Sequence, residues 1–410
     1  MVTDNLREVM AGTGKKDGII KYKLAYTVLI ILCYLFGREV PLYGIDVSVY
    51  LERNLDAEAL LIQTISGDLN RCSLFALGIS PYITASVLVQ IFSACGSIGS
   101  RRRTPPGKLN RITLLLMMGF AFFQAIVRVQ EISFKTMEAA LLPVKFIAVT
   151  EMMTGVVLII WMAERNKKYG IGGQTVLICI NILDGMAANA KGHGAGELLL
   201  PLSIAFGVMI IILVMENSEK RIPVQRISIH NIYADKNYLA VKLNPVGVMP
   251  VMFSTAFFML PQLAVTGLCG LFPDNSGLVW WQENLVLSRV TGVCIYIGLL
   301  YVLTIVFALI FISPGVITEQ LLKSGDSIAN LHAGCETKRY LVGTVCRISL
   351  LSATVMGICL GIPMVLQLKG IVESSLVMIP SSAMMLTGIW HNLREEFLTI
   401  RSYDMYKSFI

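Results

Sequence analysis

The chain has 410 residues, of which 55% are hydrophobic and 15% charged, and its mean hydropathy is +0.68. A soluble domain of this size carries far more charge, so the composition excludes one and indicates an integral membrane protein. The formal net charge of +7 is the ordinary excess of basic residues in the loops on one side of a membrane, and it requires no nucleic acid as a partner.

Membrane spans are predicted from the intervals between charged residues. About 20 apolar residues cross a hydrocarbon core, and eight intervals hold 15 to 31 uncharged residues. These intervals follow Arg71, Arg111, Lys168, Glu197, Lys242, Arg289, Arg347 and Glu373. Two weaker spans are added, residues 24–36 and residues 143–163, the second of which contains Glu151. The sequence therefore predicts an all-α polytopic membrane protein with ten transmembrane helices.

The distribution of lysine and arginine predicts the orientation of these spans. Ten is an even number, so both termini should face the same side. If the N-terminus is inside, the inner segments hold 25 of the 34 Lys and Arg residues. This bias places both termini in the cytoplasm. The first span has no small-residue cleavage site after it, so it is expected to be retained and not removed as a signal peptide.

Residues that carry chemistry are sparse. The four histidines form no metal-binding motif, and no two of the nine cysteines are spaced C-x-x-C, so neither a metal site nor a disulfide framework is predicted. The segment 170–173, Gly-Ile-Gly-Gly, lacks the Lys and Ser/Thr of a phosphate loop and is read as a tight entry into a short span. Asp184 is either a functional acid within a span or a solvated residue at its outer end. No catalytic residue and no cofactor are predicted.

Backbone breakers gather in two spans. Gly78 and Pro81 interrupt the second span, and the segment 243–250, LNPVGVMP, opens the seventh. Irregular backbone at membrane depth is tolerated only where protein or a water-filled cavity satisfies its polar groups. These two spans are therefore expected to line a cavity. Broken helices of this kind also occur in secondary transporters.

Six segments, in order along the chain, resemble the SecY family, which forms the pore of the bacterial protein-translocation channel. The first two are GREVPLYGID (37–46) and SLFALGISPYITASVLVQIF (73–92), which resemble the exit of the first span and the plug with the second span. The other four are RRRTPPGKLNRIT (101–113), KYGIGGQTVLI (168–178), KRIPVQ (220–225) and KLNPVGVMPVMF (242–253). They resemble the loop after the second span, the entry to the fifth, a basic loop and the seventh span.

This resemblance implies an architecture and a function. The family has two pseudo-symmetric halves, which correspond here to residues 1–190 (spans one to five, with the plug) and 191–410 (spans six to ten, with cytoplasmic motor-docking loops). A plug over residues 65–77 is expected to be hinged at Gly78 and Pro81. An hourglass pore that opens sideways between spans two and seven passes unfolded polypeptides and releases apolar segments into lipid. The chain is then a passive channel in the bacterial cytoplasmic membrane and not an enzyme.

The resemblance also assigns residues to the pore and its lateral gate. Ile79 and Ile83 in the second span, Leu183 in the fifth and Met252 in the seventh match positions of the apolar pore ring. Such a ring disfavours a water column when the pore is closed. The lateral gate is expected to include Gln90 and Asn244, which match polar positions on the two gate spans. No ring residue is assigned in the tenth span, because its alignment needs a gap.

Partners are implied by the cytoplasmic loops. A SecA-type motor ATPase or a ribosome is expected to dock at a surface that includes Arg221, Arg226, His332, Lys338 and Arg339. SecE- and SecG-like small subunits, or accessory Sec proteins, are the expected membrane partners. In the loop between spans eight and nine, His332 and Ala333 replace an Arg-Pro pair of the family. With RISIHN (226–231) and the short chain, this departure resembles the accessory branch that exports serine-rich glycosylated adhesins with its own motor.

Three alternatives stay open. The chain could be a housekeeping SecY. It could be a secondary transporter of small solutes, although such a protein needs acids at the midplane of the membrane and only Asp184 and Glu151 are candidates. It could also be an inactive paralogue that assists assembly or insertion, which the altered loop around His332 would support.

Overall fold

The computed structural model describes residues 18–45, 73–99, 106–132, 134, 141–190, 193–226, 238–271, 275–328, 331–332 and 334–406. Within these ranges ten helices have 18 or more residues, one at each predicted span. They are α2 (Gly18–Glu39), α5 (Ser80–Gly99), α6 (Pro106–Glu131), α7 (Leu141–Tyr169), α8 (Gly173–Ala190), α9 (Ala195–Asn217), α10 (Met249–Leu271), α12 (Val290–Ile312), α14 (Cys335–Leu368) and α15 (Ser374–Tyr406). Two shorter helices are α11 (Ser276–Asn284) and α13 (Pro314–Ser324).

The prediction of a polytopic helical membrane protein is confirmed. By length and composition, 7 helical segments of the described chain can cross a membrane. They lie at α2, α6, α7, α9, α10, α12 with α13, and α14. In α5 the apolar segment is shorter, Ser80–Phe92, and α8 and α15 are not among the seven. A total of ten crossings therefore stays a prediction.

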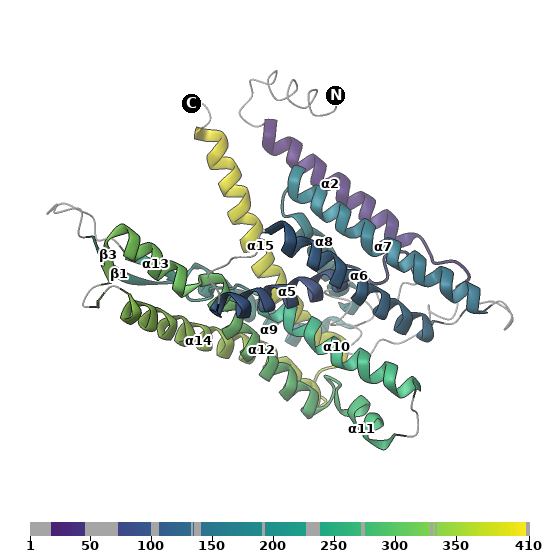
Figure 1. Ribbon diagram of the computed structural model, residues 1–410. Coiled ribbons are helices and arrows are strands. Elements are labelled where there is room, and N and C mark those ends of the chain that lie inside the picture. The colour runs from purple at the N-terminus through teal and green to yellow at the C-terminus, as the bar shows by residue number, and fades with distance from the viewer. Residues whose placement is uncertain are drawn as a thin grey trace.

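The predicted halves meet along two lines of helix contact. Helix α15 packs against α8 and α2, and α10 packs against α5 and α6. Figure 1 shows α15 running between α2 and α7 on one side and α13 and α14 on the other. The start of α2 and the end of α15 both lie at the top of this view. That both termini face the cytoplasm stays a prediction. The division at residue 190 and the pseudo-symmetry stay predictions.

A three-stranded sheet joins two loops that are far apart in the sequence. Strand β1 (Glu219–Arg226) pairs antiparallel with β2 (Tyr238–Lys242) and, along its second part, with β3 (Asp326–Ile328). Ile222, Val241 and Ile328, one from each strand, form a buried cluster with Leu341 and Ile348 of α14. The sheet is thus anchored by apolar side chains on the start of α14.

The entry to α8 is a tight turn, as the sequence predicts. The Asn166 side-chain amide donates to the carbonyl oxygens of Ile171 and Gly173, at 3.0 and 2.9 Å. The Thr27 hydroxyl donates to Asn166 Oδ1 and accepts the N–H of Ile171, so that α2 also holds the turn. The N–H of Gly172 donates to the carboxylate of Glu396 on α15. Polar contacts from three helices therefore fix the position of α8.

Candidate functional site

Three of the four predicted ring residues lie together. Ile79, Ile83 and Met252 are 1%, 3% and 8% exposed, and all three belong to one buried apolar cluster. The cluster draws on helices of both predicted halves, because it includes residues of α2, α5, α8, α10 and α15. A buried apolar cluster shared by the two predicted halves is the arrangement that a dewetted constriction needs.

The fourth predicted ring residue, Leu183 of α8, does not belong to this cluster. The buried members from α8 are Leu177, Ile178 and Ile182, whereas Leu183 lies outside the cluster and is 52% exposed. Successive residues of a helix are rotated by about 100°, and here Ile182 faces the cluster while Leu183 is turned outward. The structure therefore does not bring Leu183 together with Ile79, Ile83 and Met252, and its place in a pore ring stays a prediction.

The predicted breaks fall where two helices begin. Gly78 has a φ of +55° and Gly247 a φ of +68°, a left-handed conformation that glycine adopts at little cost. Two residues later, α5 starts at Ser80 with Pro81 in its first turn, and α10 starts at Met249 with Pro250 in its first turn. Proline is tolerated there because the N–H that it lacks has no partner within the helix. The breaks thus precede the helices and do not kink them. Most of the expected plug, residues 65–72, lies outside the described residues.

The two predicted gate residues have separate surroundings. Asn244 is 1% exposed, and its amide nitrogen donates to Glu216 Oε1 of α9 at 3.0 Å. Its amide oxygen accepts the hydroxyl of Ser352 on α14, also at 3.0 Å. Gln90 is half-buried on α5, and the described contacts include no hydrogen bond between it and Asn244. The amide of Asn244 therefore fastens the entry of α10 to α9 and α14.

Asn244→Leu is expected to destabilise the protein by about 2 kcal/mol, because it removes two buried hydrogen bonds and leaves the Glu216 carboxyl without that donor. Gln90→Leu, the matched control, should change stability by less than about 0.5 kcal/mol. Both can be measured as shifts in the midpoint of unfolding in detergent. Equal costs would mean that Asn244 has no special structural role.

Asp184 takes part in an ion pair that the sequence analysis did not anticipate. Arg38 Nη1 lies 2.7 Å from Asp184 Oδ2, with the Arg38 side chain 4% exposed and that of Asp184 47% exposed. One turn away, the Tyr34 hydroxyl donates to Asn181 Oδ1 at 2.7 Å. Positions 34 and 38 share one face of α2, so the two contacts join α2 to α8 at successive helical turns. They fasten α8 at the level of Ile182.

The predicted docking residues lie on the sheet and at the start of α14. Arg221 on β1 is exposed, and its Nε donates to Glu219 Oε1 at 2.8 Å while its guanidinium carbon lies 4.7 Å from the centre of the Tyr238 ring. This hydrogen bond to Glu219 raises the pKa of Arg221 above its ordinary value, so the group stays charged. Arg226 ends β1 opposite Asp326 of β3. Strand pairing therefore brings the two docking loops together.

His332 and the two basic residues that follow it are exposed. The Nδ1 atom of His332 lies 3.1 Å from Glu336 Oε2, and its side chain is 94% exposed. Lys338 and Arg339 in the first turns of α14 also face outward. Ala333 lies outside the described residues. Lys338 and Arg339 are thus presented together at the start of α14.

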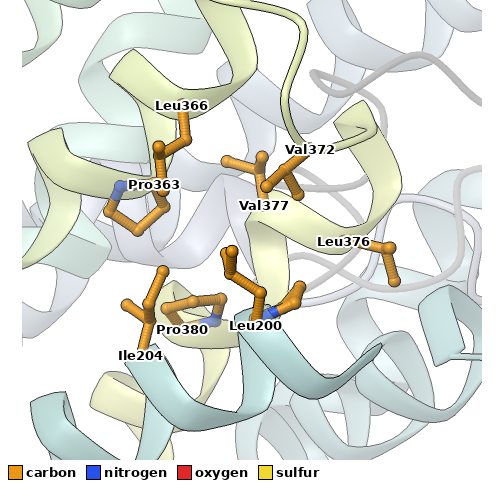
Figure 2. Close-up of a pocket in the computed structure, with 9 residues that line it drawn as sticks. Leu200, Ile204, Pro363, Leu366, Val372, Leu376, Val377 and Pro380 are labelled. Carbon is orange, nitrogen blue, oxygen red and sulfur yellow. The ribbon is translucent and has the colours of Figure 1, made fainter. Parts of the chain in front are cut away.

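A small apolar hollow lies between α9, α14 and α15. Figure 2 shows the side chains of the three helices facing one another around it. Its lining consists of Leu200, Pro201, Ile204, Pro363, Leu366, Val372, Leu376, Val377 and Pro380. The space for a water-sized group is about 10 Å³, near the minimum for one water molecule. None of the lining side chains carries a polar group that could bind an ion or a polar solute.

The structure adds residues that the sequence analysis left unassigned. In α15, where no ring residue was predicted, Met378, Met384 and Met385 are fully buried in the same cluster as Ile79 and Met252. Methionine is flexible and polarizable, which suits a seal against varied surfaces. The only signal in the sequence is the methionine-rich run itself, and an apolar run does not tell which face is turned inward.

Comparisons with known proteins agree with this geometry. A model of the SecY family matches residues 73–389. The chain is 30% identical over 404 residues to the accessory Sec system protein translocase subunit SecY2 of Streptococcus agalactiae, and the match covers 96% of this chain and 97% of that protein. The fold is similar to that of a protein-conducting channel, with a TM-score of 0.66 and 15% identity over 94% of this chain and 93% of the other. It is also similar to Sec61 in the canine ribosome-channel complex from the endoplasmic reticulum, with a TM-score of 0.63 and 17% identity over 94% and 93%. The chain belongs to the SecY family, in the branch of the accessory Sec system.

Proposed function

We propose that this chain is the protein-conducting subunit of an accessory translocase in the cytoplasmic membrane of a bacterium, with both termini in the cytoplasm. The observation that carries the proposal is the buried cluster that includes Ile79, Ile83 and Met252, because these residues come from α5 and its entry and from α10. A seal of apolar side chains excludes ions while closed, and it yields to a passing polypeptide because no specific bond has to break. Its expected cargo is unfolded polypeptide, with serine-rich glycosylated adhesins as the proposed specialised class.

Disulfide cross-linking in membranes tests this function. Single cysteines replace Ile83 or Met252 in a chain that lacks its nine native cysteines, and a cysteine is placed in a stalled export substrate. Cross-links at both positions are expected, with none at a control cysteine replacing Leu115, which is 74% exposed on α6. Absence of cross-links at both positions, with the substrate stalled and the variants folded, would favour a solute transporter or an inactive paralogue.

We also propose that a SecA-type ATPase drives transport by docking on the sheet and the start of α14, and that SecE- and SecG-like subunits or accessory Sec proteins complete the assembly within the lipid. Exposed cations at a docking surface act mainly through long-range attraction, which salt weakens. The exposed side chains of Lys338 and Arg339, in the first turns of α14, support this assignment.

Reversal of these two charges tests the docking surface. Lys338→Glu with Arg339→Glu is expected to weaken binding of the cognate ATPase about tenfold at low salt, with a smaller effect as the salt concentration rises. Lys369→Glu, an exposed lysine just beyond the opposite end of α14, is the matched control and should leave binding unchanged. Binding to membrane vesicles can be measured by flotation. Loss of binding in the control alone would place the ATPase elsewhere.

A further inference from the structure

The turn that leads into α5 is held firmly. Residues 73–79 are buried apart from Leu74, which is half-buried. The N–H of Leu74 donates to the carbonyl oxygen of Val40 at 2.9 Å, and Ser73 pairs with Pro41 in an isolated antiparallel bridge. Within the turn, the N–H of Gly78 donates to the carbonyl oxygen of Phe75 at 2.9 Å. The turn is therefore attached to the segment just after α2 and is closed upon itself.

The ring of Phe75 occupies a slot, here called the Phe75 seat, formed by Tyr34 and Gly37 of α2 and Gly155 of α7. The rings of Tyr34 and Phe75 are stacked, with centres 5.7 Å apart and planes at 10°. A Cβ atom at Gly37 would overlap the ring edge of Phe75, and one at Gly155 would overlap the backbone carbonyl of Leu74. Both glycines thus leave space that the turn fills.

The Phe75 seat is linked directly to the predicted pore-ring residues Ile79 and Ile83. The carbonyl oxygen of Ile79 accepts the N–H groups of Tyr82 and Ile83, both at 3.1 Å, and so starts the first turn of α5. One short turn connects Phe75 to Ile79, and Gly78 and Pro81 are buried as well. Phe75 and Ile79 are therefore held in fixed positions relative to each other. The predicted hinge at Gly78 and Pro81 is therefore packed on all sides. The chain cannot pivot there while Phe75 occupies its seat.

We propose that Phe75 is a positioning residue of the constriction: held in the Phe75 seat, it fixes Ile79 and Ile83, and it keeps this seat while a polypeptide passes. Gly78 and Pro81 then do not act as the pivot for any movement of the chain that precedes the turn. This inference rests on the proposed channel function, which it deepens.

Locking the turn tests the proposal. Residues opposite each other in an antiparallel pair have Cα atoms about 4.5 to 5.5 Å apart, which lies within the range of disulfides. The bridge between Pro41 and Ser73 therefore allows a lock by Pro41→Cys with Ser73→Cys in the full chain without native cysteines. Disulfide formation is quantified by thiol alkylation, and the two single variants are the controls.

The oxidised and reduced forms of the locked protein are expected to transport a cysteine-free substrate at the same rate, within about twofold. Transport that stops on oxidation and returns on reduction would overturn the proposal, because the turn would then have to leave its seat. If the unlocked chain moves no polypeptide, the proposed function fails. The role of Phe75 is then tested by a measurement that needs no substrate.

That measurement is the ion conductance of the idle channel in planar bilayers. Gly37→Ala should displace the Phe75 ring and raise the conductance severalfold, since the apolar seal would be disturbed. Phe75→Leu removes Cε2 and Cζ, two of the atoms that the new methyl group would overlap. The double variant should therefore return to within about twofold of the parent. A double variant that leaks as much as Gly37→Ala alone would contradict the proposed role of Phe75.

Discussion

Asp184→Leu is expected to destabilise the protein by about 3 kcal/mol, whereas Arg38→Met should cost less than about 1 kcal/mol. The two changes break the same ion pair, but they leave different groups behind. The Arg38 side chain is 4% exposed, so the loss of Asp184 takes one carboxylate from a buried charge. The Asp184 side chain is 47% exposed, so the loss of Arg38 leaves a charge that is only half-buried.

The midpoint of denaturation in mixed detergent micelles measures this asymmetry. The double variant Arg38→Met with Asp184→Leu should recover most of the loss, because it removes both charges. Asp184→Asn, which keeps the size of the side chain, is the matched control for lost packing and should behave like Asp184→Leu. Equal costs for the changes at positions 38 and 184 would contradict the view that burial of the guanidinium decides the outcome.

Gly155→Ala is expected to destabilise the protein by about 2 kcal/mol, although alanine favours helices over glycine. The added methyl group would overlap the carbonyl of Leu74. A backbone group cannot rotate away as a side chain can, so α7 or the turn before α5 must shift. The same unfolding midpoint measures the effect.

Gly119→Ala on α6 provides the control for this change. An added methyl group there would meet no atom within 4 Å, so only the helix propensity should act, and the variant should be as stable as the parent or more stable by up to about 1 kcal/mol. If Gly155→Ala were equally harmless, the close approach between α7 and the turn would not exist in the folded protein.

The sequence predicted those features that depend on local backbone chemistry. The starts of α5 and α10 follow from Gly78 with Pro81 and from Gly247 with Pro250, because these residues restrict the chain wherever they occur. The tight entry to α8 follows from its glycines in the same way. The positions of all ten long helices could be predicted because an apolar interval must be long enough to cross the membrane.

The sequence could not predict which face of an apolar helix turns inward. In α8 both Ile182 and Leu183 are apolar, and only the packing of α8 against its neighbours shows that Ile182 is the buried one. A helix with apolar residues on all sides carries no periodic signal for this choice. The methionines of α15 were left unassigned for the same reason.

Charged residues within the structure were also missed. The sequence analysis assigned no role to Arg38 or Glu216, yet both are buried. Their partners lie far away in the sequence, Asp184 on α8 and Asn244 in the segment between β2 and α10. Such pairs depend on tertiary packing, which a single sequence without an alignment does not reveal.

The sheet has a mechanical consequence. Strand β1 leads out of α9, β2 leads into α10, and β3 lies between α13 and α14. Because β1 is hydrogen-bonded to both of the other strands, a load applied to either of the two loops that form the sheet is shared by four helices at once. A motor protein that binds only one of these loops would therefore exert force on α10, which lines the proposed pore, and on α14 at the same time.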